Sequence, residues 1–302
     1  MTTETIPAPP AAIDGTSALP AAPARRASWV RSVCRNPAVA IGGFVLLLLV
    51  AMAVFAPYIT YADPEAVAPV HRKQGPCAMF WFGTDILGRD IFSRVVFGAR
   101  ISLIVGSSVA LLACAAGLVV GGVAGYFRWA DNVLMRIMDG MMAIPSILLA
   151  IAMIALSHAG VWSVVIAITI TEIPRVARFV RGNVLTIRGQ LFIEAAVASG
   201  TRPARILARH VFPNLVSPLA VQATFICAAA ILLEAALSFL GAGIPPNIPS
   251  WGNIMAEGRG IWQTSPHTVL FPALFLTATV LSMNVLGDGV RDFLDPQMNR
   301  RD

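Results

Sequence analysis

The chain has 302 residues, of which 57% are hydrophobic and only 13% are charged, and its formal net charge is +6. Because average soluble domains carry about 25% charged residues, this composition excludes an ordinary soluble globular domain. The charges are clustered, and they leave long stretches without any Asp, Glu, Lys or Arg, namely residues 101–127, 140–171, 210–233 and 235–256. Apolar stretches of about 20 residues can cross a bilayer as a helix. The sequence therefore predicts an all-α polytopic membrane protein, whose Arg-rich segments are topology signals and not a nucleic-acid surface.

Residues 1–35 are predicted to form a disordered cytoplasmic tail. Residues 1–24 are rich in Ala and Pro and nearly free of large apolar side chains, so they cannot bury enough surface to order themselves. A signal peptide is the alternative interpretation of the next apolar run, 38–56. Its 19 residues exceed the usual ~7–15 of a signal peptide's apolar region, and no small-x-small cleavage site closes it. A retained first transmembrane helix is the favoured interpretation.

Six transmembrane helices are predicted from the apolar runs. They are 38–56, 101–126, 137–156, 161–178, 216–240 and 268–286. Pro145 is expected to kink the third, because proline removes a backbone donor. In the second, Gly117, Gly121 and Gly125 form a smooth face that suits close helix packing, either within the chain or at a subunit interface.

The distribution of basic residues predicts the orientation. With the N-terminus inside, 16 of the 22 Lys and Arg residues lie on the cytoplasmic side. Cytoplasmic loops of membrane proteins carry such an excess. Both termini and the segment 179–215 are therefore predicted to be cytoplasmic.

Two outer segments remain. The first, 57–100, contains Thr84 and Asp85 as possible helix caps. Two i,i+4 pairs of opposite charge follow, Asp85–Arg89 and Asp90–Arg94. This pattern predicts an amphipathic helix on the outer surface before the second span. The other outer segment, 241–267, is rich in Gly and Pro and is predicted to be a structured loop with little regular secondary structure.

Signals of enzymatic chemistry are absent. The only lysine, Lys73, does not follow a glycine-rich phosphate loop, so this chain is not expected to hydrolyse ATP itself. Its four histidines are scattered over different segments and do not form a metal-binding or catalytic pattern. We predict neither catalytic residues nor a metal or cofactor site in this chain.

Two acidic residues lie in or near predicted spans. Glu234 is inside the fifth span, with no other charge within 20 residues on either side. An ionisable group in a span is costly and by default faces a cavity or a partner. A role in a translocation path or gate and a structural hydrogen-bonding role are both open for Glu234. Asp139 lies near the cytoplasmic start of the third span, where a structural role at a helix end is favoured over a proton relay. Together with Glu234 it is also a candidate for the translocation path or gate.

The segment EAAVASGTRPARILARHVFPN, residues 194–214, interrupts the apolar pattern. Gly200 is placed to end one helix, Thr201 to cap a second, and Pro213 to stop it. At 100° per residue, one face of the second helix is apolar and the opposite face is basic. The apolar face holds Ala204, Leu207, Ala208 and Val211, and the basic face holds Arg202, Arg205 and Arg209. The sequence predicts a short cytoplasmic helix–turn–helix.

Three interpretations of this helix–turn–helix compete. A basic amphipathic helix can lie on anionic lipid. A glycine-cornered helix pair can bind DNA, but its confinement between two spans argues against that. The third interpretation is a docking element for a soluble partner, with an apolar ridge to bury and charges that orient it.

At this segment the chain resembles the permease subunits of binding-protein-dependent ABC importers. Their cytoplasmic signature is EAA, three residues, Gly, and a proline some twelve residues on, and this chain matches it with Glu194, Ala195, Ala196, Gly200 and Pro213. More narrowly, it is similar to the C-type permease of dipeptide, oligopeptide and nickel importers. That similarity rests on FGTDILGRDIFSRVVFGARISL, MDGMMAIPSILLAI, LEAALSFLGAGIPP, SWGNI and GDGVRDFLDPQ. Where that family usually has aromatic residues, this chain has Ile173 and Val176.

The resemblance implies a type I ABC importer permease in the inner (plasma) membrane, with residues 36–298 as the permease domain and 299–302 as a tail. It implies a second related permease, two ATPase subunits that bind ATP and Mg, an extracytoplasmic solute-binding protein, and peptide cargo. The ATPase-coupling residues would be Glu194, Ala195, Ala196, Gly200, Arg202, Arg205, Leu207, Arg209 and Pro213. Asp85, Arg89 and Asp90 would belong to an outer signature segment. A stand-alone channel or secondary transporter is the alternative, and the choice among dipeptides, oligopeptides and nickel chelates stays open.

Overall fold

The computed structural model describes residues 37–157 and 160–294, and this part of the chain is mostly helical. Its elements are α2 (Pro37–Val54), α3 (Ala56–Ile59), η1 (Pro69–His71), α4 (Ile91–Tyr126), α5 (Arg128–Met142), α6 (Ser146–Ala155), α7 (Val161–Arg188), α8 (Leu191–Ala198), α9 (Pro203–Ile206), η2 (Leu207–Val211), α10 (Phe212–Phe239), α11 (Trp251–Gly258), η3 (Arg259–Ile261) and α12 (His267–Leu294). The described residues contain no strand, only an isolated bridge between Thr84 and Asp90. The predicted all-α class is confirmed.

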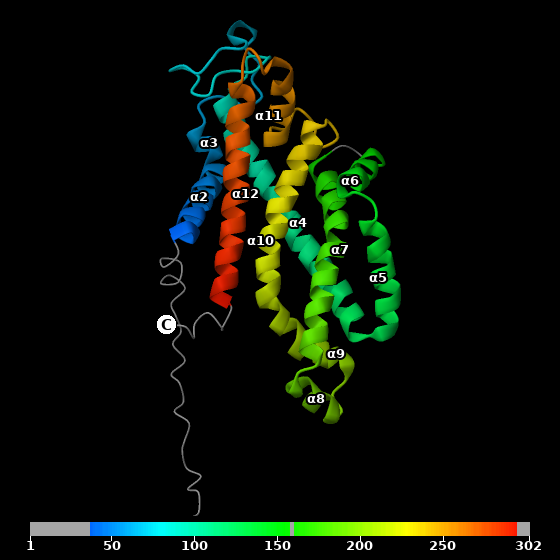
Figure 1. Ribbon diagram of the computed structural model, residues 1–302. Coiled ribbons are helices and arrows are strands. Elements are labelled where there is room, and N and C mark those ends of the chain that lie inside the picture. Colours follow the sequence, from blue (N-terminus) through cyan, green and yellow to red (C-terminus); the bar gives the residue numbers. More distant parts are fainter. Residues whose placement is uncertain (1–36, 158–159, 295–302) are drawn as a thin grey trace, which may run out of the picture.

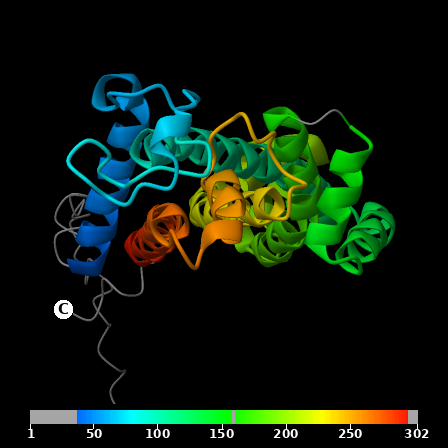
Figure 2. The same cartoon turned by 90° about the horizontal axis from the view of Figure 1, so that it is seen from above.

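The long helices form one bundle (Figure 1). α2 and α12 lie at one side, α10 in the middle, and α7 with α5 at the other side, while α4 crosses the bundle obliquely and contacts α7, α10 and α2. The view from above shows the same order, with α2 and α5 at opposite ends (Figure 2). Segment 57–90 and α11 lie at one end of the bundle, and α8 and α9 at the other. These two ends correspond to the predicted outer and cytoplasmic sides.

Four helices are long and apolar enough to cross a membrane: Pro37–Val54, Ile91–Tyr126, Pro203–Phe239 and His267–Asp292. α5 and α6 count as a fifth span only if taken together, because the chain bends by 88° between them. The prediction of six spans is therefore not confirmed. α7 was expected to be the fourth span, but its lower half carries Glu172 and the arginines 175, 178 and 181, which lower its hydropathy.

Two predictions about the outer segments are wrong. No separate amphipathic helix precedes the second span, because α4 runs without interruption for 36 residues. Its N-cap is Asp90, whose carboxylate accepts the amide of Ser93 at 2.8 Å, and not Thr84 or Asp85. The loop predicted for 241–267 contains α11, which Ser250 caps by accepting the amide of Asn253 at 3.3 Å.

Pro145 does more than kink its helix. α5 ends at Met142 and α6 begins at Ser146, because proline cannot donate to the turn before it. Pro213, expected to stop a helix, instead lies in the first turn of α10, directly after the π-helical turn η2. The chain thus continues as helix from Pro203 to Phe239, through a π-helical turn at η2.

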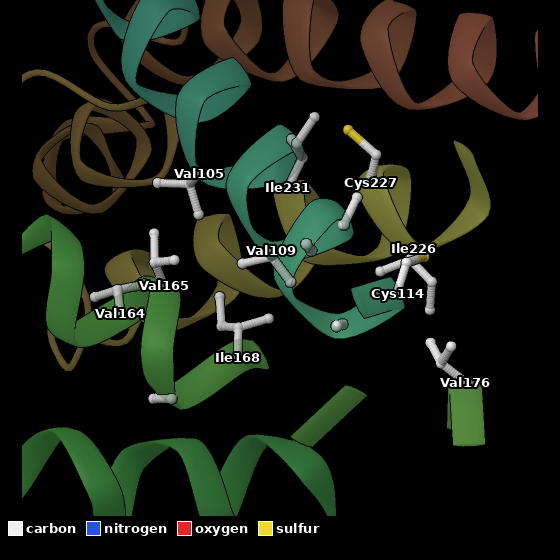
Figure 3. Packing of buried hydrophobic residues seen from close by; sticks show 14 of the residues in the cluster. Val105, Val109, Cys114, Val164, Val165, Ile168, Val176, Ile226, Cys227 and Ile231 are labelled. Carbon is white, nitrogen blue, oxygen red and sulfur yellow. The ribbon is translucent and has the colours of Figure 1, made fainter. Parts of the chain in front are cut away.

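The core lies where α4, α7 and α10 meet. Figure 3 shows it as interlocked aliphatic side chains with two thiols, among them Val109 of α4, Ile168 of α7 and Ile231 of α10. α4 approaches α7 closely at the glycine face predicted from its sequence. A Cβ on Gly117 or Gly121 would overlap Val176 or the carbonyl oxygen of Ala177. Of the two roles left open for these glycines, packing within the chain is the one that the structure supports.

Candidate functional site

A helical corner closes one end of the bundle and contains the residues of the predicted docking segment (Figure 1). α8 holds Glu194, Ala195 and Ala196 and ends in a Schellman motif. In this motif the amide of Gly200 donates to Val197 at 2.9 Å, and the amide of the next residue donates to Ala196 at 3.1 Å. Gly200 has φ +73°, a left-handed conformation that glycine adopts without steric cost. The predicted turn at Gly200 is therefore confirmed.

The second half of this corner differs from the prediction in its details. α9 begins after Arg202, which lies at the N-cap position without a side-chain cap, so Thr201 is not the cap. The buried side chains are Ile206, Leu207 and Val211, whereas Ala204 and Ala208 are exposed. A π-helical turn has more residues than an α-helical one, so the 100° spacing used for the prediction fails at η2.

The exposed surface of the corner is both basic and apolar. Arg202, Arg205 and Arg209 are exposed, as the prediction required, and so is Glu194. Three large apolar side chains are exposed with them: Leu191 is 82%, Phe192 42% and Val197 55% exposed. Exposed apolar side chains rimmed by charges are typical of an interaction surface. These apolar side chains lie on α8, whereas the predicted apolar and basic faces belong to the second helix of the helix–turn–helix.

The corner lies next to the last turns of α4 and α7, two of the three helices that form the core. A cavity of about 450 Å³ lies between α8 and these two helix ends, and it is lined by Tyr126, Arg188, Ile193, Glu194, Val197 and Ala198. At its wall, Nη1 of Arg188 donates to the carbonyl oxygen of Tyr126 at 3.1 Å, and the guanidinium lies 5.5 Å from the tyrosine ring centre. The last turns of α4 and α7 are thereby joined directly above α8.

Glu234 lies in α10 and is fully buried. Its carboxyl group accepts hydrogen bonds from the hydroxyls of Ser238 at 2.9 Å and Ser102 of α4 at 3.2 Å. These bonds join α10 to α4 and support the structural alternative for Glu234. A role in a gate stays a prediction.

We expect Glu234→Ala to lower the free energy of unfolding by about 2–3 kcal/mol, because it removes a buried acceptor and leaves two buried hydroxyls without it. Glu234→Gln keeps an acceptor and the volume, so its loss is expected to be below about 1 kcal/mol. Thermal unfolding of the purified protein, followed by tryptophan fluorescence, compares the two variants with the parent. An alanine variant that melts at the parent's temperature would contradict the structural role.

Asp139 is half-exposed and forms an ion pair with Arg178 of α7 at 2.7 Å. About two turns earlier on α5, Asp131 binds Arg181 through both carboxylate oxygens, at 2.5 and 2.7 Å. The two pairs hold α5 antiparallel to α7. This geometry agrees with the structural role favoured for Asp139, which the sequence placed at a helix end.

A buried cluster of four charges lies at the opposite end of the bundle. Asp85 accepts from Nε of Arg89 at 2.6 Å and from Nη1 of Arg94 at 2.8 Å. Glu257 of α11 accepts from the same two guanidinium groups, at 2.5 Å from Arg94, whose side chain is 1% exposed. Two positive and two negative charges thus balance, and they join the 83–90 turn, α4 and α11.

The pairing in this cluster was only partly predicted. The Asp85–Arg89 pair forms, although in a turn and not in a helix, whereas Arg94 pairs with Asp85 and Glu257 and not with Asp90. Glu257 and Arg94 were missed as cluster members. The available signal was that Glu257 is the only acidic residue between positions 235 and 287, in a segment otherwise free of negative charge.

Asp90 has a separate set of partners. Its carboxylate caps α4 and accepts the Tyr61 hydroxyl at 3.0 Å. Partial burial, and then the neighbouring Asp90 charge, raise the pKa of Tyr61 to about 12, so the phenol keeps its proton and remains the donor. Segment 57–90 is thus tied to the first turn of α4 by a bond that is independent of the four-charge cluster.

Residues 115–300 match the family model described as "Binding-protein-dependent transport system inner membrane component". Residues 26–76 match the one described as "N-terminal TM domain of oligopeptide transport permease C".

Among curated relatives, the chain is 48% identical over 272 residues to the probable peptide ABC transporter permease protein y4tQ of Sinorhizobium fredii, covering 90% of this chain and 93% of the relative. It is 43% identical to the dipeptide transport system permease protein DppC of Alkalihalophilus pseudofirmus, covering 87% of each chain. It is also 43% identical to the glutathione transport system permease protein GsiD of Pectobacterium atrosepticum, covering 90% of this chain and 91% of the relative.

Among solved structures, the chain is similar to a chain of the inward-facing MetNI methionine ABC transporter, with a TM-score of 0.56. The similarity covers 67% of this chain and 97% of that one at 20% identity, so it concerns the fold. The helix arrangement described above is therefore shared with a chain of a solved transporter.

Proposed function

The chain belongs to the family of binding-protein-dependent transport system inner membrane components, and from this premise we propose its cargo, its partners and the way it is driven. It is a multi-pass inner-membrane permease of the ABC importer type and not an enzyme. We propose that it carries peptides inward, because the relatives that it matches along most of their length are named for peptide, dipeptide and glutathione transport. We propose that the binding protein that delivers the peptide determines which peptide lengths are transported.

We propose that the chain forms half of a path with a second, related permease. Two cytoplasmic ATPase subunits, or one fused pair, would bind ATP and Mg below it, and an extracytoplasmic binding protein would deliver cargo from outside. Membrane lipid would surround the bundle. Both chain ends would be cytoplasmic, in keeping with the distribution of Lys and Arg.

The observation that carries this proposal is the exposed corner formed by α8 and α9. It offers apolar side chains for burial, three arginines to orient a partner, and a position next to the ends of α4 and α7, which the Arg188–Tyr126 hydrogen bond joins to each other. A partner that moves this corner would therefore move the two central helices. The coupling role is assigned to Glu194, Ala195, Ala196, Gly200, Arg202, Arg205, Leu207, Arg209 and Pro213. Leu207, which is buried, and Pro213, in the first turn of α10, would transmit the motion, and the exposed arginines would contact the ATPase.

Purification from detergent-solubilised membranes tests this assembly. We expect a tagged chain, expressed in its native host, to copurify with one second permease and two ATPase subunits per copy. The reconstituted complex is expected to take up peptide only when ATP and the binding protein are both supplied. A homo-oligomer that transports without ATP would instead establish the alternative of a channel or secondary transporter.

A further inference from the structure

The connection between α5 and α6 forms an elbow, which we define as residues 142–146. The two helices meet at 88°, and every residue of the elbow is exposed, Met142 to 45% and Ile144 to 47%. Neither the structural role of Asp139 nor the coupling corner accounts for this exposure. The height of the elbow along the bundle decides whether it lies at the level of the hydrocarbon or of the aqueous phase.

The elbow lies halfway along α7. The 28 residues of α7 span about 42 Å at 1.5 Å per residue. The Arg178–Asp139 ion pair lies 10 residues from the end of α7, or about 15 Å above it, and α5 runs upward for four more residues to Ala143, or about 6 Å. The ends of α4 and α7 are level, because Arg188 binds the carbonyl of Tyr126. At the height of the elbow, α4 therefore presents only uncharged residues, as a lipid-embedded helix does.

Three backbone carbonyl groups of the elbow lack a hydrogen-bond donor within the described part of the chain. Among the described residues, no group donates a hydrogen bond to the carbonyl oxygens of Met142, Ala143 or Ile144. Hydrocarbon supplies no donor, and each unsatisfied group there costs several kcal/mol. Irregular backbone at this depth is tolerated only when protein covers it or when it lines a water-filled cavity.

Charged side chains are exposed at the same depth. The side chains of Arg175 and Arg178 are 53% and 50% exposed, and that of Asp139 is 54% exposed. A charge facing the centre of a bilayer costs at least about 2.5 kcal/mol on the insertion scale. Three half-exposed charges and three free carbonyls on neighbouring helices are therefore explained together if this side of the bundle faces water.

We propose that the elbow and the Asp139–Arg178 pair line the water-filled path through which cargo passes. The free carbonyls at 142–144 would accept hydrogen bonds from water or from the N–H groups of a peptide in transit, which every peptide sequence possesses. This inference rests on the proposed function, since a path at this depth requires a transporter, and it adds the residues that form the wall.

Cysteine accessibility in the assembled transporter tests the proposal. The four native cysteines are first replaced, and Ile144→Cys is then introduced. Leu111→Cys on α4 is the matched control, because Leu111 is 72% exposed at about the same height, in the part of α4 after Arg100 that carries no charge. Membranes are treated with a charged methanethiosulfonate reagent, which requires water and an ionised thiol. We expect Ile144→Cys to react at least about tenfold faster than Leu111→Cys, because a thiol in apolar surroundings remains protonated.

The outcomes separate this inference from the proposed function. Equal, slow labelling of both cysteines, in a cysteine-free parent that still takes up peptide with ATP, would overturn the water-lined elbow and leave the transport function intact. Fast labelling of Ile144→Cys, with slow labelling of Leu111→Cys, supports the water-lined elbow. If saturating peptide and binding protein then lower the labelling rate of Ile144→Cys, that supports contact with cargo. Fast labelling in a complex that never transports peptide would leave the elbow in water and contradict the proposed function.

Discussion

Replacing Arg94 with methionine is expected to destabilise the protein by about 3–5 kcal/mol, the largest stability loss anticipated for a single substitution here. Arg94 binds both carboxylates of the buried four-charge cluster, and its side chain is 1% exposed. Without it, Asp85 and Glu257 share the single guanidinium of Arg89, and one buried negative charge loses its partner. The loss is large because the site of the Arg94 guanidinium and the Asp85 carboxylate are both buried, so water replaces the missing cation poorly.

Thermal unfolding of the detergent-purified protein measures this effect. The melting temperature of Arg94→Met is expected to fall by roughly 6 °C or more. The control is Arg100→Met, on the same helix but exposed, with an expected loss of about 0.5 kcal/mol or less. Adding Glu257→Gln to Arg94→Met restores the balance of charge and is expected to recover part of the loss. An Arg94→Met protein as stable as the Arg100→Met control would refute the structural role of the cluster.

Replacing Gly200 with proline is expected to separate ATP hydrolysis from transport. Gly200 has φ +73°, whereas proline holds φ near −65°, and proline also lacks the N–H that Gly200 donates to Val197. The Schellman turn cannot form, so α8 leaves its position below α4 and α7. The spans themselves are untouched, and membrane insertion is expected to remain normal.

The measurement is ATPase activity and peptide uptake of the reconstituted complex, assayed in parallel. For Gly200→Pro we expect uptake to fall at least about tenfold while ATP hydrolysis continues, a loss equal to about 1.4 kcal/mol of coupling or more. Gly200→Asn is the matched control, because asparagine tolerates the left-handed conformation and keeps the N–H. Uptake by Gly200→Asn is expected to stay near the parent's value. Full uptake by the proline variant would exclude a coupling role for the corner.

The sequence predicted the elements that depend on local signals. The apolar runs located α2, α4, α10 and α12, and Gly200 located the corner, because a helix end and a left-handed glycine are decided within a few residues. The basic face of the corner was also predicted correctly, since its three arginines are exposed. Local rules were sufficient for these features.

The errors arose where distant contacts or a rare helical turn decide the result. Arg94 was paired with Asp90 on the i,i+4 rule, but Glu257, 163 residues away, is its partner. Pro213 was assigned to a helix end, yet the π-helical turn before it places it in a first turn. For the α5–α6 elbow only a kink at Pro145 was expected, whereas the chain bends by 88° there, because hydropathy averages over a bend and does not report its size. None of these three outcomes can be read from a single window of sequence.

The contact between α4 and α7 has a mechanical consequence. Gly117, Gly121 and Gly125 of α4 pack against Val176, Val180 and Val184 of α7, in that order. The two helices are therefore parallel here, and the glycine–valine contact recurs every four residues on both. A shift of one helix along the other by less than one such repeat, about 6 Å, would drive valine methyl groups into helix backbone. Smaller shifts of one helix along the other are therefore sterically blocked. α4 and α7 must travel as one rigid body, so the hinges of the molecule lie outside this pair.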